Sequence, residues 1–192
     1  MFFLRRPNRD SIAAFLAEQR THDFSYSEVG ATAHHPPRGY LVDRHRVKVG
    51  AGARAFSDAS ACLRAWRMFR LGWLELVEAG TSIEAGSTVA VLVRHLGFWS
   101  LNACRIAYVI DEPRHHGFAY GTLRDHAEQG EERFSARWAD DNSVWYEILA
   151  FSRPRQWQAR AARPLARRLQ KRFARDSMAA MVRCVGERGL AK

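Results

Sequence analysis

PLARRLQKRFARDSMAAMVRCV, residues 164–185, is the stretch that decides the fold. A mostly apolar ridge recurs along it at four-residue spacing, formed by Leu165, Leu169, Phe173, Ser177, Met181 and Val185 and widened by Ala166, Ala174, Met178 and Val182. The basic residues fall mostly on the opposite side. This spacing predicts a long amphipathic helix over residues 164–186. Pro164 suits the first turn of that helix, and Gly186 suits its C-terminal end.

The positive charge of the chain is concentrated around this helix. Residues 153–192 contain twelve Lys and Arg against two acidic residues, a net charge of +10, which equals that of the whole protein. Two interpretations stay open. The charges form a solvated helix face whose arginine stems cover apolar surface, or they bind nucleic acid or an anionic membrane surface. The residues that would make the second contact are Arg167, Arg168, Lys171 and Arg175.

The segment before the helix has the pattern of antiparallel strands. The expected strands are residues 88–93, 102–110, 118–123, 132–138 and 143–151. The clearest alternation sets Phe134, Ala136 and Trp138 against polar neighbours, which indicates one buried face and one wet face. The polar residues 140–142 suit a hairpin turn. The gaps between strands are too short for parallel crossovers, so the sheet is expected to be antiparallel.

The first third of the chain adds smaller elements. We expect a short helix starting at Asp10 or Ser11 within an N-terminal helical extension, residues 1–22. An irregular loop over residues 24–38 precedes a strand over 40–49. The remaining expected elements are a helix over 57–69, a strand over 73–77, a turn at 79–80 and a short helix over 154–162. Together these elements predict one α+β domain, residues 1–192, in which a curved antiparallel sheet wraps around the long C-terminal helix.

The cysteines and short motifs limit the chemistry. Cys62, Cys104 and Cys184 have no CxxC spacing, and their odd number suggests free thiols in a reducing compartment. The chain shows no secretory signal pattern or membrane-spanning run, so the expected location is the cytoplasm. Neither His34-His35 nor His115-His116 has a placed carboxylate or cysteine partner, and no phosphate-binding loop or nucleophile elbow occurs. We therefore expect no metal and no cofactor.

Several stretches resemble a known family when they are taken together. They are His95–Arg105 (HLGFWSLNACR), Tyr108–Glu112 (YVIDE), Gly117–Leu123 (GFAYGTL), Gly130–Phe134 (GEERF), Trp145–Ile148 (WYEI) and Phe151–Pro154 (FSRP). They resemble the bacterial and plant family of unknown function numbered nineteen-ninety, which is placed near the START-like, or helix-grip, superfamily. The resemblance implies an apolar ligand held between sheet and helix, in a carrier, a cyclase or aromatase, or a sensor. Arg124-Asp125 departs from the Pro-Gly turn expected in relatives.

The pocket candidates follow from these motifs. They are Trp99, Arg105, Tyr108, Tyr120, Thr122, His126, Trp145, Glu147 and Phe173. Tyr120, Thr122 and His126 could line a pocket mouth. Alternatively, Gly121 only allows a bulge in the strand, and His126 is a solvated residue of the following loop. Glu147 is either an acid of raised pKa in a cavity or the partner of an arginine.

The leading functional prediction is therefore a protein that binds an apolar small molecule between the sheet and the C-terminal helix. One alternative is a cyclase or hydrolase that uses the same cavity, with His126, Tyr120 or Glu147 as acid–base groups. The other alternative is the anionic-surface binder described above. No residue pair identifies a nucleophile and its base, and the oligomeric state is left open.

Overall fold

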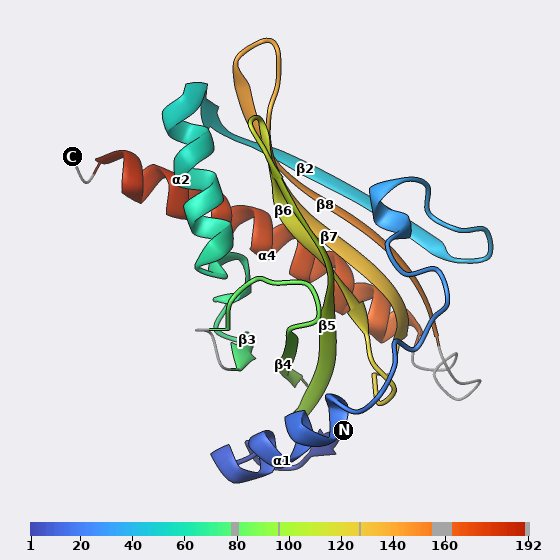
Figure 1. Cartoon of the computed structure of the whole chain (residues 1–192). Coiled ribbons are helices and arrows are strands. Elements are labelled where there is room, and N and C mark those ends of the chain that lie inside the picture. The colour runs from blue at the N-terminus through green and yellow to red at the C-terminus, as the bar shows by residue number, and fades with distance from the viewer. Residues whose placement is uncertain (78–80, 96, 127, 155–162, 191–192) are drawn as a thin grey trace.

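A curved antiparallel sheet wraps around one long helix in the computed structural model of the chain (Figure 1). The structure describes residues 1–77, 81–95, 97–126, 128–154 and 163–190. The strands are β1 (Phe2–Phe3), β2 (Leu41–Ala51), β3 (Leu74–Val77), β4 (Thr88–His95), β5 (Phe98–Glu112), β6 (His115–Thr122), β7 (Glu128–Trp138) and β8 (Ser143–Pro154). The helices are α1 (Arg9–Gln19), α2 (Gly52–Arg64) and α4 (Arg163–Leu190), with 3-10 turns η1 (Ala31–Ala33) and η2 (Arg67–Phe69).

The strand order is β2-β8-β7-β6-β5-β4-β3, with β1 pairing with the start of β5. Every pairing is antiparallel, which confirms the expected antiparallel sheet. The turn between β7 and β8 is closed by the Ser143 carbonyl, which accepts from the Ala139 amide at 2.9 Å. The expected turn at 79–80 lies outside the described residues. So does the short helix expected over 154–162, except for Pro154, which ends β8 instead.

Helix α4 crosses the concave side of the sheet, as its ridge predicts (Figure 1). Phe173, Ser177 and Met181 are buried there, whereas Val182 is 41% exposed and does not widen the ridge as expected. The predicted stop at Gly186 is also wrong, because the helix continues to Leu190. Arg54 of α2 explains the extension, since its guanidinium donates to the carbonyl of Gly189 at 3.1 Å and so satisfies an end of α4.

Helix α2 covers one half of the concave face and is joined to α4 by a disulfide between Cys62 and Cys184. The expectation of three free thiols is therefore wrong, and only Cys104 is a free cysteine, buried in the sheet. Residues 122 positions apart meet because α2 packs against α4. The spacing of cysteines along the sequence does not indicate a disulfide between residues so far apart.

The half of the concave face beneath α2 is a solid core. Phe118, Phe134 and Tyr146 project from β6, β7 and β8 and are fully buried there with Met181. The Tyr146 hydroxyl shares a 2.8 Å hydrogen bond with the hydroxyl of Ser177 on α4. This bond satisfies two buried polar groups and fixes the position of α4 over the sheet.

The convex face is covered by the N-terminal segment. Ile12, Phe15 and Leu16 of α1 pack against a second apolar cluster on β4 and β5. The cap of α1 is Asn8, whose side chain accepts from the Ser11 amide, and not Asp10 or Ser11 as expected. Coverage by this segment makes both faces of the sheet apolar over part of its area.

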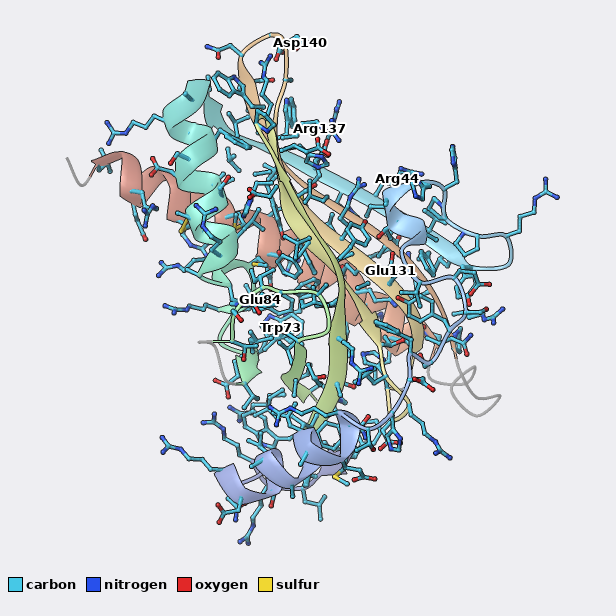
Figure 2. All side chains as sticks on the ribbon, viewed as in Figure 1. Arg44, Trp73, Glu84, Glu131, Arg137 and Asp140 are labelled. Atoms are coloured by element: carbon cyan, nitrogen blue, oxygen red, sulfur yellow. A yellow bond between two sulfur atoms is a disulfide. The ribbon has the colours of Figure 1, made fainter. Side chains whose placement is uncertain are left out.

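Further along the segment, the buried carboxylate of Glu131 on β7 holds the chain around η1 against the sheet (Figure 2). This carboxylate accepts from the Tyr26 hydroxyl at 2.7 Å and from the Thr32 amide at 2.9 Å. The Tyr26 ring lies against Gly121, where a Cβ would collide with the ring and its hydroxyl. Gly121 therefore allows close packing with Tyr26. The bulge between β5 and β6 lies at Ala107 of β5 and not at Gly121.

None of the helices in the described ranges is long and apolar enough to cross a membrane.

Two glycines give a matched test of this packing. We expect Gly121→Ala to lower the free energy of unfolding by about 1–3 kcal/mol, because a methyl group would overlap the Tyr26 ring. Gly186→Ala should instead raise it by about 0.5–1 kcal/mol, since Gly186 lies in an exposed helical turn with open space around it. Urea denaturation of both variants measures this, and a destabilised Gly186→Ala variant would contradict the extension of α4.

Candidate functional site

A cavity of about 380 Å³ lies between the sheet and the first half of α4, beyond the reach of α2. Its walls are mainly apolar and are formed by Phe69, Trp73, Leu74, Val91, Val93, Ile148, Ala150, Leu165, Leu169, Phe173 and Ala174. Leu165 and Leu169 are only half-buried, in contrast to the fully packed Met181 further along α4. The predicted ridge thus does two things, filling the core with one half and roofing a hollow with the other.

The floor of the cavity carries a polar row across the sheet. Strand pairing places Tyr120 opposite Glu132, Glu132 opposite Ala150, and Ala150 opposite Asp43. Directly paired residues of antiparallel strands share a face, so this row projects into the concave side. The Tyr120 hydroxyl donates to Oε2 of Glu132 at 3.0 Å.

Glu132 is an acidic group in an apolar setting. No ion pair to Glu132 occurs within the described part of the chain, and its neighbours on the cavity walls are mostly carbon. Burial raises the pKa of Glu132 to about 7, the negative charge of Asp43 adds to the rise, and the Tyr120 hydrogen bond partly opposes it. The carboxyl group therefore exchanges a proton with solvent near neutral pH, which is the property expected of a functional acid in a cleft.

Cys104 and Thr122 also lie on the floor, and neither side chain is charged. Burial raises the pKa of the Cys104 thiol, and the nearby charge of Glu132 adds to the effect, so Cys104 remains protonated. Thr122 lines the cavity, but its hydroxyl is already bonded to the Gly130 amide at 3.0 Å and to the Ser25 hydroxyl at 2.6 Å. Thr122 thus has mainly a structural role at the end of β6.

His126 also lines the cavity, as expected, but its ring is engaged with the backbone. Its Nδ1 lies 2.9 Å from the carbonyl and 3.1 Å from the amide nitrogen of Glu128. Burial lowers the pKa of His126 to about 4, although the contact with the Glu128 backbone raises it slightly. The imidazole is therefore neutral at physiological pH.

The mouth of the cavity is formed by an ion pair between the sheet and the helix. Arg167 of α4 binds Asp43 of β2 through both ends of its guanidinium, with one contact at 2.9 Å. The hydrogen bond from Arg167 is the main cause that holds the pKa of Asp43 below its usual value. Gln170 on the next turn donates to the Ser152 hydroxyl at 3.2 Å. These contacts tie the first half of α4 to β2 and β8 above the hollow.

Five of the predicted pocket residues lie outside the cavity, on the convex face. Trp145 stacks on Arg46 with 4.6 Å between the guanidinium carbon and the ring centre. Glu147 pairs with Arg137 at 3.5 Å, near the hairpin tip that Asp140 marks in Figure 2. Glu147 is thus paired with an arginine, one of its two expected roles, and the interpretation as a cavity acid is wrong.

The other three residues serve the N-terminal segment. Arg105 donates to the carbonyls of Gln19 and Arg20 at the end of α1, at 3.4 and 3.0 Å. The Tyr108 hydroxyl is 2.7 Å from that of Thr32. Trp99 packs with the α1 cluster. These side chains were expected in the pocket because the sequence does not show that the convex face is also covered.

The basic residues proposed for an anionic surface are not equivalent. Arg167 is half-buried in its pair with Asp43, and Arg175 donates to Asp176 at 2.9 Å. Arg168 and Lys171 are exposed, and within the described ranges neither has an ion pair. Two of the four predicted residues thus spend their charge on contacts within the chain.

Glu132 and Asp43 are the site residues that sequence reasoning missed. The signal for Glu132 was available, because it has the same strand parity as Phe134 and Ala136, which were predicted to face inward. Asp43 likewise shares its parity with Val47 on β2. An acidic residue on a buried face is rare enough to mark a candidate site.

Comparisons with known proteins agree with this architecture. The family described as a domain of unknown function (DUF1990) matches residues 25–180. A UPF0548 protein of Deinococcus radiodurans is 38% identical over 198 residues, covering 97% of this chain and 100% of that protein. A UPF0548 protein of Dictyostelium discoideum is 33% identical over 208 residues, covering 97% and 96%. The solved Zhui aromatase/cyclase of a Streptomyces species has a TM-score of 0.53 at 17% identity, covering 79% of this chain and 97% of that one, which shows a shared helix-grip fold.

The raised pKa of Glu132 predicts a pH dependence of stability. Its ordinary value is 4.5 and its folded value about 7, so the folded state holds a proton that the unfolded state has lost between these pH values. The free energy of unfolding should therefore fall as pH rises from 4.5 to 7, by on the order of 2 kcal/mol from this group. Urea denaturation of the unaltered protein and of Glu132→Gln at each pH gives two free energies of unfolding, whose difference isolates the effect of this group. A difference in free energy that stays constant from pH 4.5 to 8 would contradict the prediction.

Proposed function

The chain belongs to the DUF1990 family, and we propose that it binds a small apolar molecule in the cavity beneath the first half of α4. The cavity volume is within the range of ligand sites, and the pattern of apolar walls with few polar groups is typical of them. The observation that carries the proposal is the contrast between the two halves of α4. One half is packed solid against aromatic side chains, whereas the other presents Leu165 and Leu169 to a hollow.

Binding would follow from burial of apolar surface on both partners. Each square ångström removed from water contributes roughly 25 cal/mol. Leu165 and Leu169 on the helix face Ile148 and Ala150 on the floor, so a flat apolar molecule between them would be covered on both sides. Phe69 and Phe173, whose ring centres are 5.4 Å apart, close the inner end. The Tyr120–Glu132 pair would then offer a polar contact that fixes the orientation of the ligand.

Filling the floor of the cavity tests this proposal. The protein isolated from its own organism should retain an apolar molecule that native mass spectrometry detects as added mass. Ala150→Phe should abolish that mass, because Ala150 is the small residue between Glu132 and Asp43 and a phenyl ring there occupies the hollow. Ala179→Phe on the exposed side of α4 is the control and should keep the bound molecule.

Equal retention by both variants would overturn the location of the site. The absence of any added mass from the unaltered protein, together with no binding of added apolar compounds, would overturn the proposed function. Circular dichroism and urea denaturation of Ala150→Phe separate a filled cavity from a misfolded protein.

A second candidate function is proton-transfer catalysis in the same cavity. The supporting observation is that the pKa of Glu132 is about 7, because a carboxyl group of this kind both takes and returns protons at neutral pH. The similar Zhui protein is named an aromatase/cyclase, so the fold accommodates catalysis in at least one such protein. Of the acid–base groups expected from sequence, Tyr120 contacts Glu132, whereas Glu147 lies on the other face.

Hydrogen exchange in heavy water tests this second function. In a bound ketone such as 2-acetylnaphthalene, the carboxylate of Glu132 would remove a proton from the carbon beside the carbonyl, leaving the electron pair on the enolate oxygen, and would return a deuteron. The protein should therefore speed deuterium incorporation, followed by NMR. Glu132→Gln should lose the exchange but keep ketone binding. An unchanged exchange rate in Glu132→Gln would contradict a catalytic role.

A further inference from the structure

We infer that the molecule held in the cavity carries an uncharged carbonyl oxygen, which receives a hydrogen bond from the side chain of Glu132. This inference rests on the proposed function and adds the chemical class of the ligand. It is drawn from the hydrogen bonds of Glu132, from the charges around the cavity and from the space over Ala150.

The hydrogen bonds leave one oxygen of Glu132 for a ligand. Tyr120 donates to Oε2, so that oxygen acts as an acceptor. Oε1 has no hydrogen-bond partner among the residues that the structure describes, and the side chain lines the cavity. In the neutral acid, the proton is therefore expected on Oε1, where it points to the hollow as a donor. A carbonyl oxygen is the simplest group that only accepts.

The charges around the cavity disfavour ionic ligands of either sign. At the mouth, the exposed ammonium group of Lys171 on α4 opposes a cation, and the whole chain carries a net charge of +10. Deeper inside, an anion would meet the buried carboxyl group of Glu132, whereas the charge of Asp43 at the mouth is already paired with Arg167. The burial that raises the pKa of Glu132 also favours its neutral, donating form. An uncharged ligand with an acceptor oxygen meets none of these penalties.

The remaining groups near Glu132 do not replace it as the donor. Cys104 on β5 is a weak donor, and burial keeps its thiol neutral. His126 holds its Nδ1 against the Glu128 backbone. Glu132 and Asp43 are two strand spacings apart, about 10 Å, with only the methyl group of Ala150 between them. A two-ring compound fits this span with its oxygen at the Glu132 end.

Three probes that share one carbon skeleton test the inference: 2-acetylnaphthalene, 2-ethylnaphthalene and 1-(2-naphthyl)ethylamine. At pH 6, calorimetric titration should give about tenfold tighter binding of the ketone than of the hydrocarbon, the usual value of one hydrogen bond, and the weakest binding for the amine. The ketone should bind more weakly as pH rises through 7, since Glu132 then loses its proton. Glu132→Gln, which keeps a donor but cannot ionise, should bind the ketone equally at pH 6 and pH 8.

Glu132→Leu is the matched control and should bind the ketone and the hydrocarbon with equal affinity. If the unaltered protein makes no distinction between these two probes, the carbonyl inference is wrong while the apolar site stands. Tightest binding of the amine, strengthening above pH 7, would overturn the inference in favour of cation recognition. If none of the three probes binds, the cavity is not a ligand site, and the proposed function fails with the inference.

Discussion

The packing of α4 across the concave face is the constraint on which the rest of the structure depends. The sheet is too large for one helix to cover, and α2 covers only the end where Phe118, Phe134 and Tyr146 lie. The disulfide between Cys62 and Cys184 holds the two helices together over that end. Over the other half, Arg167 and Gln170 tie α4 to β2 and β8 at the mouth of the cavity, and the space beneath the helix stays open. The cavity is thus a consequence of which half of the sheet has two helices.

The same arrangement gives Glu132 its unusual properties. A carboxyl group in a solid core would be too costly to keep, and one at the surface would ionise normally. Glu132 lies between these limits, because a hollow separates it from the walls and Tyr120 satisfies one of its oxygens. The hollow leaves one oxygen of Glu132 free, whereas burial among the apolar walls raises its pKa. Binding and proton transfer are both consistent with this environment.

Sequence patterns predicted the architecture better than the site. The α4 ridge and the inward face of β7 were predicted correctly through Phe173, Met181 and Phe134. The other face of β7 was expected to be wet, which is wrong, because Glu131 and Ser135 are buried there. Strand β8 is apolar on both faces, because Tyr26 and Tyr40 pack against Phe151 on the convex side, so alternation misassigned Trp145 and Glu147. The disulfide and the Asp43–Arg167 pair depend on contacts between distant segments, for which local periodicity carries no signal.

A crystal structure of the protein isolated from its own organism is the most direct test of the central claim, that the first half of α4 roofs an open hollow. We predict electron density for a compact molecule over Ala150, bounded by Leu169 and Phe173 and within hydrogen-bond distance of Oε1 of Glu132. Leu165, Leu169 and Phe69 lying directly on Ala150, with no space left above Glu132, would contradict it.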